Sequence, residues 1–164
     1  MLYYWNPRHP ASQGKYGSFY DIQTQQLAAN ALSIGIPVLF RQNAEADGIS
    51  IVDNSKVTFA YPGTYDIQFS FQFHNEGGGG NGQTVEIWLV QNGEAVPYTN
   101  TRVAVNTNSP YVVAAWDFII TATAGSNAQI YWATDNHHIV MKYNTGAMGG
   151  PAIPSAILTV IPVA

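Results

Sequence analysis

The sequence has no cysteine among its 164 residues, and only 10% of the residues are charged. Without cysteine the chain can form no disulfide, no thiolate metal site and no cysteine nucleophile. A typical soluble domain has about 25% charged residues, so Asn, Gln, Ser, Thr and Gly must provide most of the polar surface here. A surface of this kind often belongs to a protein that is partly covered by partners.

The 10 acidic and 6 basic residues give a net charge of −4, and the basic residues are spread along the chain. This distribution excludes the basic footprint that nucleic-acid binding requires. The amino terminus lacks a basic segment followed by an apolar one, so we expect no signal peptide. No apolar run approaches the length of a membrane span. We therefore expect a protein made in the cytoplasm, with no nucleic-acid partner and no membrane partner.

The segment that follows Pro62 and Gly63 alternates strictly between apolar and polar residues. Its odd positions from Tyr65 to Phe73 are apolar and its even positions from Asp66 to His74 are polar. A period of two predicts a strand with one face on a core and the other in water. We expect this strand to lie in the outer sheet of a two-sheet protein.

The rest of the chain from residue 17 also favours short strands separated by turn residues. The segment 24–32 is the only helical candidate, of at most two turns. Many short strands at this spacing predict an all-β, two-sheet antiparallel jelly-roll sandwich over residues 17–164, preceded by an extended arm over 1–16. The expected strands are 17–22, 34–42, 48–53, 56–60, 64–74, 83–91, 101–106, 110–122, 128–134, 138–143 and 153–163.

Two of the expected strands, within 112–120 and 153–163, are apolar on both faces. In an isolated sandwich their outer faces would form an apolar patch larger than monomers normally expose. We therefore predict that one sheet packs against copies of itself around a three-fold axis. Loops or the amino-terminal arm could instead cover these strands. The predicted trimer-interface residues are Val113, Ala115, Ile157, Thr159 and Ile161.

The pattern Phe59-x-x-Pro62-Gly63-x-Tyr65-x-Ile67-x-Phe69 resembles the central strand of the C1q and tumour necrosis factor jelly rolls. Together with the segments Tyr111–Trp116 and Pro154–Val160, it is also similar to jelly-roll domains of bacteriophage structural proteins. The resemblance covers residues 17–163. It implies a C1q-like or tumour necrosis factor-like fold and a homotrimer.

The resemblance also implies a role in the virion, either as a head decoration protein or as a fibre or spike tip. The chain has no collagen-like stalk and starts at Met1 with a short arm, which favours a capsid decoration (cement) protein bound to the major capsid protein or another virion protein. The alternative is a receptor-binding tip that recognises host glycans, with Tyr98 and Tyr143 as candidate contacts. A C1q-like bacterial surface protein is disfavoured by the missing signal peptide.

The arm carries three aromatic residues, Tyr3, Tyr4 and Trp5, next to Pro7 and Pro10. Tyr and Trp are enriched at binding hot spots, and proline keeps a segment extended. We predict that these three residues form a capsid docking arm. The arm could also fold back onto its own sandwich.

We predict no catalytic residues, no metal site, no cofactor and no enzymatic activity. The best metal candidates are Asp135, His137 and His138, but neighbouring residues on a strand point to opposite faces, so at most one of the two histidines could join Asp135. We interpret the segment 135–138 as a polar turn that opens a strand. The glycine-rich tract Gly77–Gly82 has no following Lys-Ser/Thr and joins two strands, which indicates a hairpin loop and no phosphate site.

Overall fold

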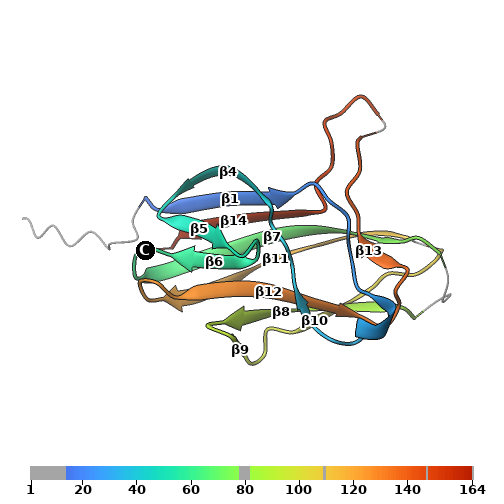
Figure 1. Ribbon diagram of the computed structural model, residues 1–164, viewed down its shortest axis with the longest axis horizontal. Helices are drawn as coiled ribbons and strands as arrows, with labels where there is room; N and C mark the ends of the chain where they lie inside the picture. Colours follow the sequence, from blue (N-terminus) through green and yellow to red (C-terminus); the bar gives the residue numbers. More distant parts are fainter. Residues whose placement is uncertain (1–13, 78–81, 109, 147, 164) are drawn as a thin grey trace, which may run out of the picture.

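The structure is a computed structural model that describes residues 14–77, 82–108, 110–146 and 148–163. These residues form two antiparallel β-sheets that enclose one hydrophobic core, with η1 (Ala29–Ala31) as a single turn of 3-10 helix (Figure 1). The prediction of an all-β, two-sheet antiparallel sandwich is therefore confirmed.

Sheet A has the order β4-β1-β14-β7-β11, and the short strands β13 and β2 extend it beside the end of β7. Its strands are β1 (Tyr16–Asp21), β2 (Gln25–Gln26), β4 (Gln42–Asp47), β7 (Gly63–Asn75), β11 (Tyr111–Ala122), β13 (Ile139–Met141) and β14 (Ala156–Pro162).

Sheet B has the order β10-β8-β12-β6-β5, with β3 paired to β12 and β9 paired to β8. Its strands are β3 (Ile36–Pro37), β5 (Ile49–Val52), β6 (Lys56–Phe59), β8 (Thr84–Gln91), β9 (Glu94–Ala95), β10 (Thr101–Ala104) and β12 (Asn127–Thr134).

The core lies between the sheets and consists largely of aromatic and β-branched side chains. The odd residues of β7 from Tyr65 to Phe73 all point into it and are at most 5% exposed. Phe73 contacts Trp132 of sheet B with ring centroids 5.6 Å apart, so the two sheets meet directly at this point. The strict alternation of β7 thus places its apolar half in the core, as predicted.

We expected β7 to lie in a different sheet from the two strands that are apolar on both faces, which are β11 and β14. This expectation is wrong. Residue Ser70 of β7 is opposite Ala115 of β11 on one side and Ile157 of β14 on the other. All three strands therefore share sheet A. The alternation within a strand shows which side faces the core, but it does not show which strands lie beside it.

The expected strand 34–42 is also not continuous. Ile36 and Pro37 pair with β12 in sheet B, and the chain then crosses to sheet A, where β4 begins at Gln42. In the crossing, the Val38 N–H donates to the carbonyl of Ile130 (2.8 Å). The apolar character of this segment comes from its passage through the core, where Val38 and Phe40 are buried. The helical candidate 24–32 contains the short strand β2 and the single turn η1.

Strands β13 and β14 follow the same edge of β7 and are interrupted by a 143–154 loop. The carbonyl of Gln72 accepts a hydrogen bond from the Lys142 N–H (2.7 Å), and its own N–H donates to the carbonyl of Ser155 (2.9 Å). A single residue of β7 therefore bonds both ends of the interruption. The loop between them projects from the body of the molecule (Figure 1).

Candidate functional site

All five residues predicted for the trimer interface lie on the outward face of sheet A. Val113 and Ala115 come from β11, and Ile157, Thr159 and Ile161 come from β14, which lies on the far side of β7. Two strands that are 34 residues apart in sequence thus present their outer residues on one surface. The structure brings the five together, and their part in an interface stays a prediction.

Two further apolar side chains, Ile119 and Tyr111, share this surface and are 65% and 67% exposed. Both have the same parity as Val113 along β11, so alternation could have identified them. We call this surface the sheet A patch and define it by Tyr111, Val113, Ala115, Ile119, Ile157 and Ile161.

A polar row runs through the middle of the patch along β7. The Gln68 amide donates to Oδ2 of Asp66 (2.8 Å), and the Gln72 amide donates to Oγ of Ser70 (3.4 Å). Oδ1 of Asp66 is buried and has no hydrogen-bond partner among the described residues. An unpaired buried oxygen is costly, so Asp66 carries an energetic cost within this row.

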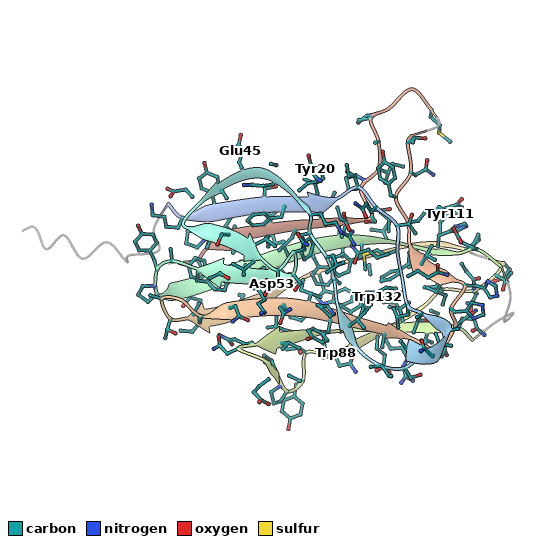
Figure 2. The ribbon with its side chains drawn as sticks, in the orientation of Figure 1. Tyr20, Glu45, Asp53, Trp88, Tyr111 and Trp132 are labelled. Carbon is teal, nitrogen blue, oxygen red and sulfur yellow. The ribbon has the colours of Figure 1, made fainter. Side chains whose placement is uncertain are left out.

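At one end of the patch, a small hollow of about 110 Å³ separates β11 from the base of the 143–154 loop. Val113 and Ile153 line opposite sides of it. The ring of Tyr111 also borders this hollow and stacks on His74 of β7. The patch and the loop base therefore form one continuous surface. Figure 2 shows Tyr111 and Tyr20 on the side of the molecule from which the loop rises.

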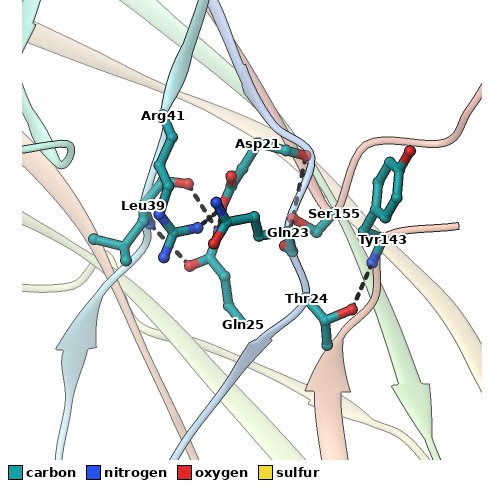
Figure 3. Close-up of polar contacts among 8 residues, drawn as sticks. All are labelled: Asp21, Gln23, Thr24, Gln25, Leu39, Arg41, Tyr143 and Ser155. Carbon is teal, nitrogen blue, oxygen red and sulfur yellow. Dashed lines mark hydrogen bonds and ion pairs between the residues drawn. The ribbon is translucent and has the colours of Figure 1, made fainter.

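A buried polar cluster holds the crossing segment against sheet A (Figure 3). The carboxylate of Asp21 is fully buried and pairs with Arg41 and with the Gln25 amide (2.8 Å). Gln25 also exchanges two hydrogen bonds with the backbone of Leu39, at 2.8 and 2.9 Å. The Ser155 N–H donates to the carbonyl of Asp21 (2.9 Å). These bonds join β1, β2, the crossing segment and the residue that precedes β14, which is a structural role.

The segment 135–138 is a polar turn before β13, as expected, so the opposite-facing arrangement of a strand does not apply to His137 and His138. Their rings are side by side, with centroids 4.0 Å apart. The carboxylate of Asp135 accepts hydrogen bonds from Thr84 instead (3.1 Å to its N–H). In the part of the chain that the structure describes, no three His, Asp or Glu side chains are close enough to hold a metal ion.

The two tyrosines that were candidate glycan contacts differ in exposure, and the predicted arm residues lie outside the described part of the chain. Tyr98 is fully exposed on sheet B, whereas Tyr143 is half-buried beside Thr24, whose hydroxyl accepts its N–H (3.3 Å). Tyr3, Tyr4 and Trp5 of the arm, and most of the glycine-rich tract, lie outside the described residues. No helix among the described residues is long and apolar enough to cross a membrane.

Comparison with known proteins gives a structural match but no sequence match. No protein-family model matches the chain, and no curated protein sequence is significantly similar to it. The crystal structure of mouse APRIL at pH 8.5 superposes with a TM-score of 0.57 over 91% of this chain and 98% of that chain, at 9% identity. The fold is therefore a jelly roll of the tumour necrosis factor type. At this identity the likeness shows the fold alone.

Proposed function

We propose that this protein is a virion structural protein: a homotrimeric capsid decoration protein whose subunits meet through the outward faces of their A sheets. The observation that carries the proposal is the sheet A patch, in which Val113 and Ile119 are 58% and 65% exposed on one strand and Ile157 and Ile161 are 37% and 39% exposed on another. Burying a side chain of this type contributes about 1.5–3 kcal/mol. A subunit with four such side chains on one face, next to Tyr111 and Ala115, gains substantially from association.

The edge of sheet A supports the same proposal. Strand β11 has 12 residues, and the described residues pair it with β7 alone. A long unpaired edge with exposed apolar residues invites association with other chains, and natural proteins normally shorten, charge or cover such edges. Here Asp117 is the only charged residue of the strand. Closed association around an axis covers the edge and limits growth of the assembly.

The decoration role is supported by the resemblance to phage structural proteins and by the aromatic arm. In this role the trimer ties neighbouring shell subunits together, because three linked contacts bind far more tightly than one. Tyr3, Tyr4 and Trp5 are the docking residues of each arm. The protein carries out no chemical reaction in this proposal, and the virion is its location.

The oligomer is tested with one charged substitution on each sheet. Light scattering of the wild-type protein should give a mass of about three times 17.8 kDa. Ile157→Asp should yield monomers, because the interface would bury an unpaired charge. Val52→Asp is the matched control, since Val52 is 44% exposed on sheet B. A stable wild-type monomer, or a trimer that tolerates Ile157→Asp, would contradict the interface.

The decoration role is tested separately by removing residues 1–13, which leaves β1 and the Lys15–Asp47 ion pair intact (2.9 Å). The truncated protein should remain trimeric and should lose binding to purified capsids in a co-sedimentation assay. Full decoration of capsids by the truncated trimer would show that the arm is not the docking element. Failure of the wild-type trimer to bind any capsid would refute the decoration role while leaving the trimer untouched.

A receptor-binding tip is the second candidate, and one observation favours it. Tyr98 is 105% exposed and borders a hollow on sheet B, away from the sheet A patch. An exposed aromatic ring beside polar side chains is a common element of binding sites.

A further inference from the structure

The outward face of sheet B carries a shallow groove made of two hollows on either side of Glu86. The larger hollow, about 320 Å³, lies between Glu86, Trp88, Tyr98 and Asn100. The smaller, about 150 Å³, lies between Glu86 and Ser33. Figure 2 shows Trp88 on the side of the molecule opposite to Tyr20 and Tyr111. The groove is therefore separate from the surface that the trimer would bury.

The indole of Trp88 is fixed in the floor of this groove. A Cβ atom on Gly35 would lie only 2.2 Å from Cζ2 of the indole, so the backbone of Gly35 packs directly against the ring. Tyr131 is the cross-strand partner of Trp88 on β12, with ring centroids 5.9 Å apart. The ring is thus held between a backbone segment and a second aromatic side chain.

Tyr98 rises at the rim of the larger hollow from a turn that is clamped to β8. The hydroxyl of Thr99 donates to the carbonyl of Val96 (2.8 Å) and accepts the N–H of Leu89 (3.1 Å). Tyr98 itself has φ +65°, a left-handed conformation that side-chain-bearing residues rarely adopt. Backbone strain that presents a fully exposed aromatic ring serves no packing purpose here, which points to contact with a ligand.

The polar groups of the groove are also held in place. Glu86 accepts hydrogen bonds from Nε of Arg102 (2.9 Å) and from the Asn100 amide (3.0 Å), and it forms an ion pair with Arg102. These bonds lower the pKa of Glu86, with Arg102 as the larger cause. The carboxylate keeps acceptor capacity, and the bond to Glu86 orients the Asn100 amide so that its oxygen is an acceptor for hydroxyl groups.

We propose that this groove binds a neutral pyranose saccharide. The face of an aromatic ring is electron-rich, so it attracts the C–H groups on the flat side of a sugar ring, and Trp88 and Tyr98 offer two such faces. Glu86 and Asn100 accept hydrogen bonds from the sugar hydroxyls. The hollow of about 320 Å³ is at the lower end of the volumes of ligand sites, which suits one or two sugar rings.

The charges at the groove favour a neutral sugar over an anionic one. Two carboxylates, Glu86 and Asp135, lie near a single cation, Arg102, whose pKa is raised mainly by its hydrogen bond to Glu86. Two negative charges and one positive charge leave one net negative charge. Arg102 is occupied by Glu86, so a sialylated or sulfated sugar would meet repulsion there without a free cation to bind.

This inference supplies a ligand class for the receptor-binding candidate, and it does not depend on the sheet A interface. The test titrates the full-length protein with millimolar glucose, galactose, mannose, N-acetylglucosamine and their disaccharides, followed by saturation-transfer NMR. Sialic acid and galactose 6-sulfate are tested in the same way as the anionic sugars. At least one neutral sugar should bind, and Tyr98→Ala should weaken its binding by about tenfold, the size expected for one lost aromatic contact.

Tyr98→Ala removes a side chain that is wholly exposed, so the variant should fold normally. Glu86→Gln is a second variant and should weaken the same sugar, because a carboxylate acceptor becomes an amide. Tyr16→Ala, on β1 of sheet A, is the matched control and should leave binding unchanged, since Tyr16 is 42% exposed and lies on the other sheet. The proposal is overturned if no neutral sugar binds, if anionic sugars bind better, or if both groove variants bind like the wild type. None of these outcomes would alter the mass measured for the trimer.

Discussion

The ring of Tyr111 stacks on the imidazole of His74, with centroids 4.2 Å apart and an angle of 9° between the planes. The two residues are cross-strand partners on β11 and β7, at the end of the sheet A patch. The stack covers one face of the imidazole, and Nδ1 of His74 is buried without a hydrogen-bond partner among the described residues. Loss of hydration lowers the pKa of His74, and the positive charge of Lys142 lowers it further, while Glu76 opposes the shift.

This relationship predicts that the protein loses stability as the pH falls below about 6.5, the ordinary pKa of histidine. The folded state has the lower pKa, so between the folded and unfolded values the unfolded chain binds more protons. Stability therefore increases with pH across this window and is fully present above it. Urea unfolding midpoints measured between pH 5 and pH 8 should show the decline.

The variant His74→Phe keeps the aromatic stack and removes the titrating group, so its unfolding midpoint should depend less on pH. His137→Gln is a suitable control, because this histidine lies in the turn before β13. An equal slope for the wild type and His74→Phe would assign the acid sensitivity to other groups.

A second prediction concerns the fully buried carboxylate of Asp21 and its partner Arg41. Arg41→Met should lower the free energy of unfolding by about 3 kcal/mol, because it leaves a buried charge without its counter-ion. The measurement is urea denaturation at pH 7 with the slope checked for two-state behaviour. Lys56→Met is the control, since Lys56 pairs with Asp53 on the surface and such pairs contribute little. Equal effects of the two variants would contradict a structural role for the Asp21 cluster.

The inward residues of β7 could be predicted from the sequence, but the neighbours of β7 could not. Alternation is a property of one strand, and it identifies Phe71 as a core residue without any knowledge of the fold. Sheet membership depends on pairing between distant residues, as when Ser70 meets both Ala115 and Ile157. No local pattern records that pairing, so the strand was expected in the wrong sheet.

The groove on sheet B could likewise be predicted only in part from the sequence. Glu86 and Trp88 are two positions apart, so their common face follows from alternation. Gly35 and Asn100 reach the groove from other parts of the chain, and only the folded structure brings them to β8. His138 lies in the polar turn that its sequence favours, and β13 begins one residue later than the expected strand 138–143, at Ile139.

A third prediction tests whether the 143–154 loop is an ordered projection. Gly146 has φ +80°, and a Cβ atom there would lie 2.7 Å from the carbonyl oxygen of Pro151. Gly146→Ala should therefore loosen the loop without unfolding the sandwich. Hydrogen exchange should accelerate at Asn144 and Ile153, whose N–H groups bond each other's carbonyls at 3.0 and 2.7 Å.

The control for this loop is Gly149→Ala. Gly149 has a similar φ of +76°, but a Cβ atom there would meet nothing within 4 Å. Both variants carry the cost of a left-handed conformation, roughly 1–2 kcal/mol, and only Gly146→Ala adds the collision with Pro151. Equal exchange rates in the two variants would show that this packing does not hold the loop.

The last prediction uses Gly35 to connect stability with the groove. Gly35→Ala would place a methyl group 2.2 Å from the indole of Trp88, so the ring must move out of the groove floor. Overpacking of this kind costs about 1–3 kcal/mol, which urea denaturation would detect. Near-ultraviolet circular dichroism should change as well, because the contact between Trp88 and Tyr131 would be disturbed. Gly150→Ala is the control, since Gly150 has open space around it and no positive φ. If Gly35→Ala leaves both measurements as they are for Gly150→Ala, the indole is not held by this backbone, and the rigid sugar platform proposed for sheet B loses its support.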